Sequence, residues 1–210
     1  MLRPSNRSYY NLAFVFNDMP NIYLPFDYET YQQYSQNVFA AVTNLHTGKC
    51  EYFQIPGDDK SWNVLIATCA LPILFQPVKI GQNLYMDGGI TDPVPIDRAI
   101  ADGCDKNLVI VTREKDYVKK EEPAIALAAL RYRKYPQFVQ ALKSRTEHYN
   151  RAHSRLLTLE KEGKAFVIAP DDTHDWHRTE SNPEKLKNFY DDGYQFVKNH
   201  IEHIRAYIAQ

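Results

Sequence analysis

The stretch that most constrains this chain runs from Ala67 to Ile96 and has the tripeptide Asp87-Gly88-Gly89 at its centre. Residues 82–86 are typical of a short strand, so the sequence predicts that the Asp87 carboxylate stands at the carboxyl end of a strand. The two glycines allow the backbone to turn with φ > 0 and bring main-chain N–H groups close to that carboxylate. A helix is predicted to open at Pro95. Such strand-to-helix turns are where α/β folds tend to place reactive groups.

Asp87 also has a purely structural interpretation. Asp-Gly is among the commonest turn dipeptides, and most such aspartates only accept a hydrogen bond from their own backbone. Local chemistry alone therefore favours turn structure over catalysis.

Three short segments that follow one another closely along the chain favour the catalytic interpretation of Asp87. They are Ala67-Thr68-Cys69-Ala70-Leu71-Pro72, Phe75-Gln76-Pro77-Val78 and Tyr85-Met86-Asp87-Gly88-Gly89. This composite resembles the patatin-like phospholipase family. The resemblance implies an α/β fold with part of a patatin-like three-layer sheet and flanking helices. It also implies that Asp87 is the acid of a Ser-Asp catalytic dyad, with Gly88 and Gly89 fixing the turn that aims it.

The segment upstream of this composite reads as a hairpin and a helix. Residues 38–43 form a strand-length apolar run, residues 44–49 a turn, and residues 50–55 a return strand. Patatin-like proteins show a similar Thr-Asn/Asp-x-x-Thr-Gly hairpin. Residues 61–69 are predicted to form a helix packed under the Asp87 turn, and Cys69 is interpreted as a small buried residue rather than a nucleophile.

The two parts of the chain differ in their predicted secondary structure. Residues 1–120 are predicted to be the C-terminal part of a patatin-like α/β catalytic domain, with a strand at 107–112 reached by a parallel crossover. Residues 121–210 are predicted to be a helical extension with one further strand at about 165–169, similar to the C-terminal extension of some bacterial patatin-like proteins. An apolar stripe from Phe138 to Leu159 is expected to run along one helix. Arg145 lies on this stripe, so it needs a carboxylate or carbonyl partner if the stripe is buried. A last helix from Pro183 carries another stripe, from Leu186 to Ile208.

The nucleophile expected of such a hydrolase is missing. A Ser-Asp hydrolase normally raises its serine on a G-x-S-x-G turn. None of the seven serines, which are Ser5, Ser8, Ser35, Ser61, Ser144, Ser154 and Ser181, has a glycine two residues away on either side. No glycine-rich loop that could supply oxyanion-hole amides lies near the N-terminus. We therefore expect this chain to be the C-terminal part of a longer lipid acyl hydrolase and to be inactive alone.

The amino-acid composition limits the expected cellular location and the expected binding partners. Three cysteines without a CxxC pair favour reduced thiols, and the N-terminus has no apolar signal core, so a cytoplasmic protein is expected. A formal net charge of −1 gives no global attraction to nucleic acid. No cofactor and no metal are expected, because the pairs His174/His177 and His200/His203 lack further ligands in a recognised arrangement.

A regional excess of positive charge leaves one alternative open. The cations concerned are Arg131, Arg133, Lys134, Lys143, Arg151 and Arg155, together with Arg145. They would form either a solvated helix face or a patch that contacts anionic headgroups at a membrane surface. The alternative function is thus a non-catalytic lipid-surface or protein-interaction module on the same fold. Self-association of this chain is a further expectation, because the absence of an N-terminal half would expose a sheet edge and apolar surface. A third interpretation is an interaction scaffold in which the long helices form an oligomer interface.

Overall fold

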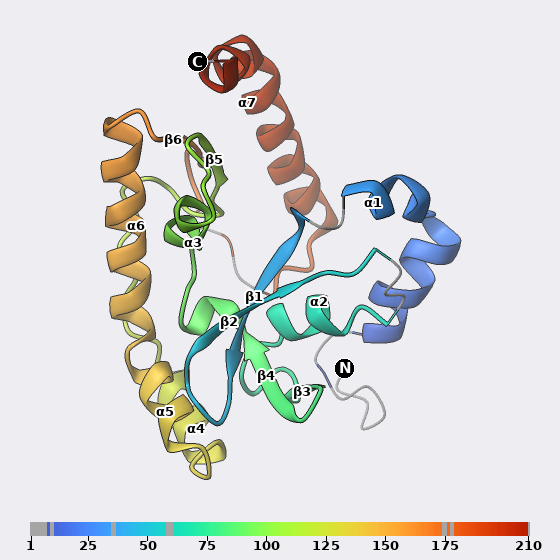
Figure 1. Cartoon of the computed structure of the whole chain (residues 1–210), viewed down its shortest axis with the longest axis vertical. Coiled ribbons are helices and arrows are strands. Elements are labelled where there is room, and N and C mark those ends of the chain that lie inside the picture. The colour runs from blue at the N-terminus through green and yellow to red at the C-terminus, as the bar shows by residue number, and fades with distance from the viewer. Residues whose placement is uncertain are drawn as a thin grey trace. The chain divides into compact units, whose positions relative to one another are not determined.

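A computed structural model of the chain describes residue 8 and residues 11–34, 37–57, 61–173, 176 and 179–209. The described part has a mixed α/β fold, which confirms the predicted fold class and is compatible with a partial patatin-like fold (Figure 1). In chain order the elements are η2 (Phe14–Tyr23), α1 (Tyr28–Tyr34), β1 (Phe39–Asn44), β2 (Cys50–Gln54), α2 (Asn63–Thr68), β3 (Val78–Ile80), β4 (Asn83–Asp87), η4 (Gly88–Ile90), α3 (Ile96–Ala101), β5 (Asn107–Ile110), α4 (Ala124–Arg131), α5 (Pro136–Lys143), α6 (Arg145–Lys161), β6 (Ala165–Ile168) and α7 (Pro183–Ala209).

These elements gather into two compact units that interleave along the chain. Unit 1 comprises residues 1–93 and 120–149, and unit 2 comprises residues 94–119 and 150–210. The boundary between residues 149 and 150 falls inside α6. The predicted boundary between a catalytic domain at residues 1–120 and a helical extension at residues 121–210 stays a prediction.

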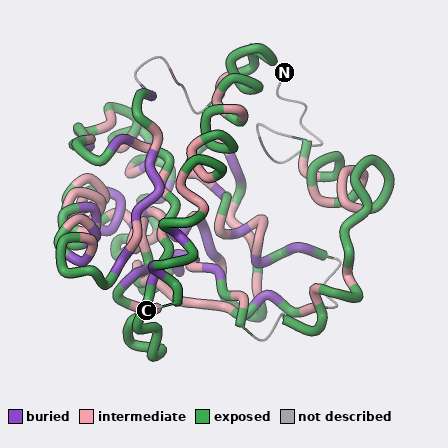
Figure 2. Tube along the Cα trace, turned by 90° about the horizontal axis from the view of Figure 1, so that it is seen from above, coloured by how far each residue is buried: buried purple, intermediate pink, exposed green. Residues whose placement is uncertain are grey.

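The sheet of unit 1 has the strand order β2-β1-β4-β3, and its neighbouring strands are antiparallel. β1 and β2 form the predicted hairpin, with Phe39 opposite Gln54. β1 also pairs with β4, so that Val42 lies opposite Asp87. The end of β4 that bears the carboxylate is therefore fixed to a strand whose residues are mostly buried. Figure 2 shows how burial varies along the described trace.

The main core of unit 1 lies next to the Asp87 turn. Met86 and Ile90 precede and follow this turn, and both side chains are fully buried. They belong to one hydrophobic cluster with Phe138 and Leu142 of α5. The remaining buried members of this cluster are Leu45, Ala70, Phe75, Ala128, Tyr132 and Ala141. Helices from beyond residue 120 thus complete the core on which the turn rests.

The single helix predicted across residues 138–159 is wrong, because the structure breaks it at Ser144. Pro136 opens α5 at its first position, as the sequence predicts, and α5 ends at Lys143. α6 then begins at Arg145. The stripe is divided accordingly: Phe138 and Leu142 join the core of unit 1, whereas Leu156 and Leu159 join that of unit 2.

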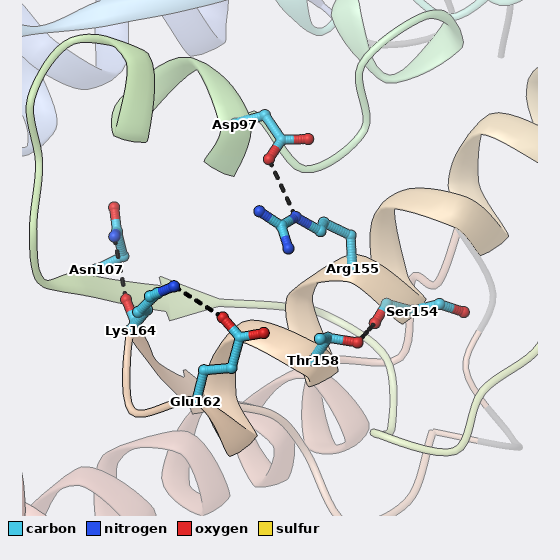
Figure 3. Close-up of polar contacts among 7 residues, drawn as sticks. All are labelled: Asp97, Asn107, Ser154, Arg155, Thr158, Glu162 and Lys164. Atoms are coloured by element: carbon cyan, nitrogen blue, oxygen red, sulfur yellow. Dashed lines mark hydrogen bonds and ion pairs between the residues drawn. The ribbon is translucent and has the colours of Figure 1, made fainter.

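Unit 2 contains a parallel pair of strands, β5 and β6. The parallel crossover that the sequence predicts ahead of β5 is instead the connection between β5 and β6, in which helices intervene along the chain. Figure 3 shows two polar contacts that tie this unit together. Asn107 donates to the Lys164 carbonyl at 3.1 Å, and Arg155 of α6 reaches the Asp97 carboxylate of α3 at 3.4 Å.

α7 begins as the sequence predicts but buries little of its predicted stripe. Asn182 caps it by accepting a hydrogen bond from the Glu184 N–H at 2.9 Å. Its buried residues are Ile204 and Tyr207, whereas Leu186 and Ile208 are exposed. Of the predicted apolar stripe from Leu186 to Ile208, only Ile204 is buried.

The uncharged run from Ser61 to Val78 does not form one long helix. Its helical part is α2, which ends at Thr68, and the chain continues through turns to β3. Among the described helices, none is long and apolar enough to cross a membrane.

Candidate active site

Asp87 is the last residue of β4, so the predicted position at the end of a strand is confirmed. Its N–H donates to the Ala70 carbonyl at 3.1 Å, which ties it to the chain just after α2. Its carboxylate oxygen Oδ1 accepts a hydrogen bond from the Gly89 N–H at 2.7 Å and so caps η4. The turn-structure role is therefore present. The side chain is also half-buried rather than enclosed.

Gly88 is required for a different reason from the one that the sequence suggests. The glycines with positive φ among the described residues do not include Gly88 or Gly89, so the expected left-handed turn is wrong. Instead, a Cβ added to Gly88 would lie 2.2 Å from the Ala41 carbonyl oxygen of β1. At Gly89 the nearest atom would be the flexible Asp87 Oδ1 at 3.1 Å. Close packing of the turn against β1 therefore excludes a side chain at Gly88.

Threonine hydroxyl groups connect the turn and α2 to β1. Thr43 is fully buried, and its Oγ1 donates to the Asp87 carbonyl at 2.8 Å. The same hydroxyl lies 2.9 Å from Thr91 Oγ1. The Thr68 hydroxyl of α2 donates to the Ala41 carbonyl at 2.6 Å. The backbone of Asp87 is thus held on both sides, which restricts the directions that its carboxylate can take.

Arg145 binds the turn from the start of α6. Its Nη1 makes an ion pair with Glu122 Oε2 at 3.0 Å, and its Nε lies 3.5 Å from the Gly89 carbonyl oxygen. The Arg145 side chain is only 13% exposed. The sequence-based requirement for a carboxylate or carbonyl partner is confirmed, because the guanidinium has one of each.

Cys69 lies near Asp87 and is exposed, so its interpretation as a small buried residue is wrong. Desolvation by the surrounding protein, together with the negative charge of Asp87, raises the pKa of the Cys69 thiol. A raised pKa keeps the sulfur protonated and weakly nucleophilic at neutral pH. The local electrostatics therefore do not favour Cys69 as a nucleophile.

The polar contacts of two β2 residues, Glu51 and Tyr52, were not predicted from the sequence. Glu51 accepts hydrogen bonds from Asn44 and from the Tyr85 hydroxyl, both at 2.7 Å. The Tyr52 hydroxyl donates to the Asp92 carboxylate. Desolvation, followed by this hydrogen bond, raises the pKa of Tyr52 well above its usual range. Alternation along β2 hints that these side chains face opposite ways, but their partners lie up to 40 residues away.

The other candidates from the sequence lie apart from this turn or outside the described residues. The predicted surface cations Arg131, Arg133, Lys134, Lys143, Arg151 and Arg155 are all exposed. Arg113 donates to the Thr173 hydroxyl at 2.8 Å within unit 2. His200 Nδ1 lies 2.8 Å from the Phe196 carbonyl oxygen, whereas His174 and His177 lie outside the described residues. No group of three potential metal ligands occurs in the part of the chain that the structure describes.

Comparison with protein families identifies two segments. Residues 18–100 match the model of the patatin-like phospholipase family, which is a family of lipid hydrolases. Residues 18–100 are a patatin-like segment. Residues 135–209 match a domain of unknown function, DUF6363. No curated protein matches the chain.

The patatin-like segment contains the whole of the Asp87 turn and the strands that hold it. β1, α2, β4 and η4 all lie between residues 18 and 100. Arg145 belongs to the DUF6363 segment, and Glu122 lies between the two matches. The turn is therefore contacted by residues from outside the patatin-like segment.

Proposed function

We propose that Asp87 is the acid of a serine-aspartate lipid acyl hydrolase, a phospholipase or esterase. The observation that carries this proposal is the arrangement of the turn. A half-buried carboxylate stands at the end of β4, and its backbone is fixed by Ala70 and Thr43. The Gly89 N–H donates to this carboxylate at 2.7 Å, and an ionised carboxylate is an acceptor that suits a hydroxyl partner.

The serine of this dyad is not among the seven serines of the chain, because none stands in a G-x-S-x-G turn. In this proposal the serine lies on polypeptide outside these 210 residues. The 210-residue chain is then inactive by itself.

In the proposed reaction the serine hydroxyl attacks the acyl carbonyl, and its proton passes to Asp87. The alcohol of the ester leaves with the proton that Asp87 accepted. Water then attacks the acyl-serine, its oxygen becoming part of the released carboxylic acid and one of its protons returning through Asp87 to the serine oxygen. A carboxylate is a weak base toward a hydroxyl, so the reaction depends on strong stabilisation of the oxyanion. The Gly89 N–H is already bonded to Asp87. Other amides must therefore serve as oxyanion donors.

Covalent labelling tests the proposed absence of the nucleophile. A fluorophosphonate probe reacts with activated serines, so the 210-residue chain should show no added mass after incubation. The Asp87→Asn variant should behave in the same way. Labelling of any of the seven serines that disappears in Asp87→Asn would place the complete dyad within this chain and overturn the proposal.

The exposed cations favour a second candidate, binding to an anionic lipid surface. Arg131, Arg133, Lys134 and Lys143 are exposed in unit 1. Each cation near such a surface contributes about 1 kcal/mol to binding. Sedimentation with phosphatidylglycerol vesicles, but not with phosphatidylcholine vesicles, should then survive Asp87→Asn and weaken with salt. Equal sedimentation of the variant with all four cations changed to Ala would exclude this candidate.

A further inference from the structure

The beginning of the DUF6363 segment, residues 135–149, packs against the candidate catalytic turn within unit 1. Phe138 and Leu142 of α5 share a buried cluster with Met86 and Ile90, the residues on either side of the turn. A Cβ added to Gly48 in the β1–β2 hairpin would lie 2.4 Å from the Gln137 carbonyl oxygen, so the backbone of α5 also approaches the hairpin closely. The beginning of the DUF6363 segment is thus part of unit 1 rather than a separate appendage.

Arg145 extends this contact to the turn itself. Gly89 is bonded on both sides: its N–H donates to the Asp87 carboxylate at 2.7 Å, and its carbonyl lies 3.5 Å from Arg145 Nε. The other side of the guanidinium is held by Glu122 at 3.0 Å. Because a guanidinium is planar and rigid, a fixed Glu122 contact also fixes the Nε that faces Gly89. A displacement of Arg145 would therefore move the residue that orients the Asp87 carboxylate.

We infer that Arg145, held by Glu122, is a positioning residue for Asp87, and that the beginning of the DUF6363 segment completes the catalytic unit of the patatin-like segment. The catalytic meaning of this role rests on the proposed function. The structural role, in which Arg145 restrains the Asp87 turn, can be tested without any catalysis.

Cys69 provides a reporter of the carboxylate. Replacing Cys50 and Cys104 by Ser leaves Cys69 as the single thiol. In that background the rate of alkylation by iodoacetamide is measured from pH 6.5 to 10. Desolvation and the negative charge of Asp87 raise the pKa of Cys69; Asp87→Asn removes the second of these causes, so the variant should react faster at neutral pH.

Arg145→Lys keeps the positive charge but cannot bridge Glu122 and Gly89 with one planar group. A loosened turn lets the carboxylate move away from Cys69. The alkylation rate at pH 7.5 should therefore rise about two-fold, and the pH profile should shift toward that of Asp87→Asn. Arg155→Lys is the matched control on the same helix, because Arg155 is exposed and pairs with Asp97. It should leave the profile unchanged.

An unchanged or slower alkylation rate in Arg145→Lys would overturn the inference, as would an unchanged rate in Asp87→Asn. Amide hydrogen exchange of Gly89 supplies a second readout, because its N–H bonds to Asp87. Exchange should accelerate in Arg145→Lys and not in Arg155→Lys, and equal exchange in both would contradict the role. Neither readout uses ester hydrolysis, so a failure of the proposed function would be seen separately, in the labelling experiment.

Discussion

At the scale of single residues, Gly88 carries the tightest steric constraint in the turn. Its α-carbon faces the Ala41 carbonyl so closely that any Cβ would collide with backbone at 2.2 Å. Gly89, its neighbour, would meet only a movable carboxylate oxygen. Adding a methyl group should therefore lower the free energy of unfolding more at Gly88 than at Gly89.

This difference predicts a clear contrast between two alanine variants. Gly88→Ala should destabilise the protein by about 1–3 kcal/mol, because the strand or the turn must shift to admit the methyl group. Gly89→Ala should cost clearly less. Urea unfolding followed by circular dichroism measures both free energies. Equal losses of stability in the two variants would show that the close packing of Gly88 against β1 is not present.

Tyr52 predicts how stability depends on alkaline pH. The pKa of its hydroxyl is raised in the folded protein, chiefly by desolvation and by its bond to Asp92. In the unfolded chain the hydroxyl ionises near its ordinary pKa of about 10. The unfolded chain therefore binds fewer protons above that pH, and the free energy of unfolding falls as pH rises.

Removing this hydroxyl should flatten the alkaline decline. Between pH 10 and 11.5, Tyr52→Phe should lose stability less steeply than the unmodified protein, by at most about 1.4 kcal/mol per pH unit. Some decline should remain, because desolvation also raises the pKa of Tyr31 and Tyr85. Urea unfolding at several pH values measures the slopes, and identical slopes in the two proteins would refute the assignment.

At the scale of elements, α5 and α7 carry similar apolar spacing but differ in what covers them. Leu142 of α5 is 2% exposed, whereas Leu186 of α7 is 47% exposed. Leu142→Ala should therefore cost about 2–5 kcal/mol through lost contacts and a cavity. Leu186→Ala, the same substitution on the exposed helix, should change stability by less than about 0.5 kcal/mol. Comparable losses in urea unfolding would mean that α7 is packed along its length.

The elements that the sequence predicted well are those that local signals specify. Turn residues between two apolar runs predicted the β1–β2 hairpin, and Asn182 followed by Pro183 predicted the start of α7. Periodicity could not predict the break at Ser144, because the stripe continues through it while the two helices join different cores. Burial of α7 likewise depends on tertiary contacts that spacing does not encode.

At the scale of the whole molecule, the sequence predicted only the part of the site that contains a recognisable motif. The composite around Asp87 placed the carboxylate correctly at the end of β4. The partners of Arg145, by contrast, come from residues 89 and 122, and no sequence pattern links these positions. Close backbone packing at Gly88 was also hidden, because positive φ and a steric limit both select glycine. These long-range contacts could be identified only from the folded structure.

The proposed role of Asp87 as the acid of a hydrolytic dyad is tested most directly by ester hydrolysis in a protein that also carries the proposed serine. The measurement is kcat for p-nitrophenyl butyrate in two matched variants. Asp87→Asn should lower kcat by about 10²–10⁴-fold, as expected for loss of a general base. Asp92→Asn, in the same segment but bonded to Tyr52, should retain most of the activity. Full activity in Asp87→Asn, or an equal loss in both variants, would contradict the account.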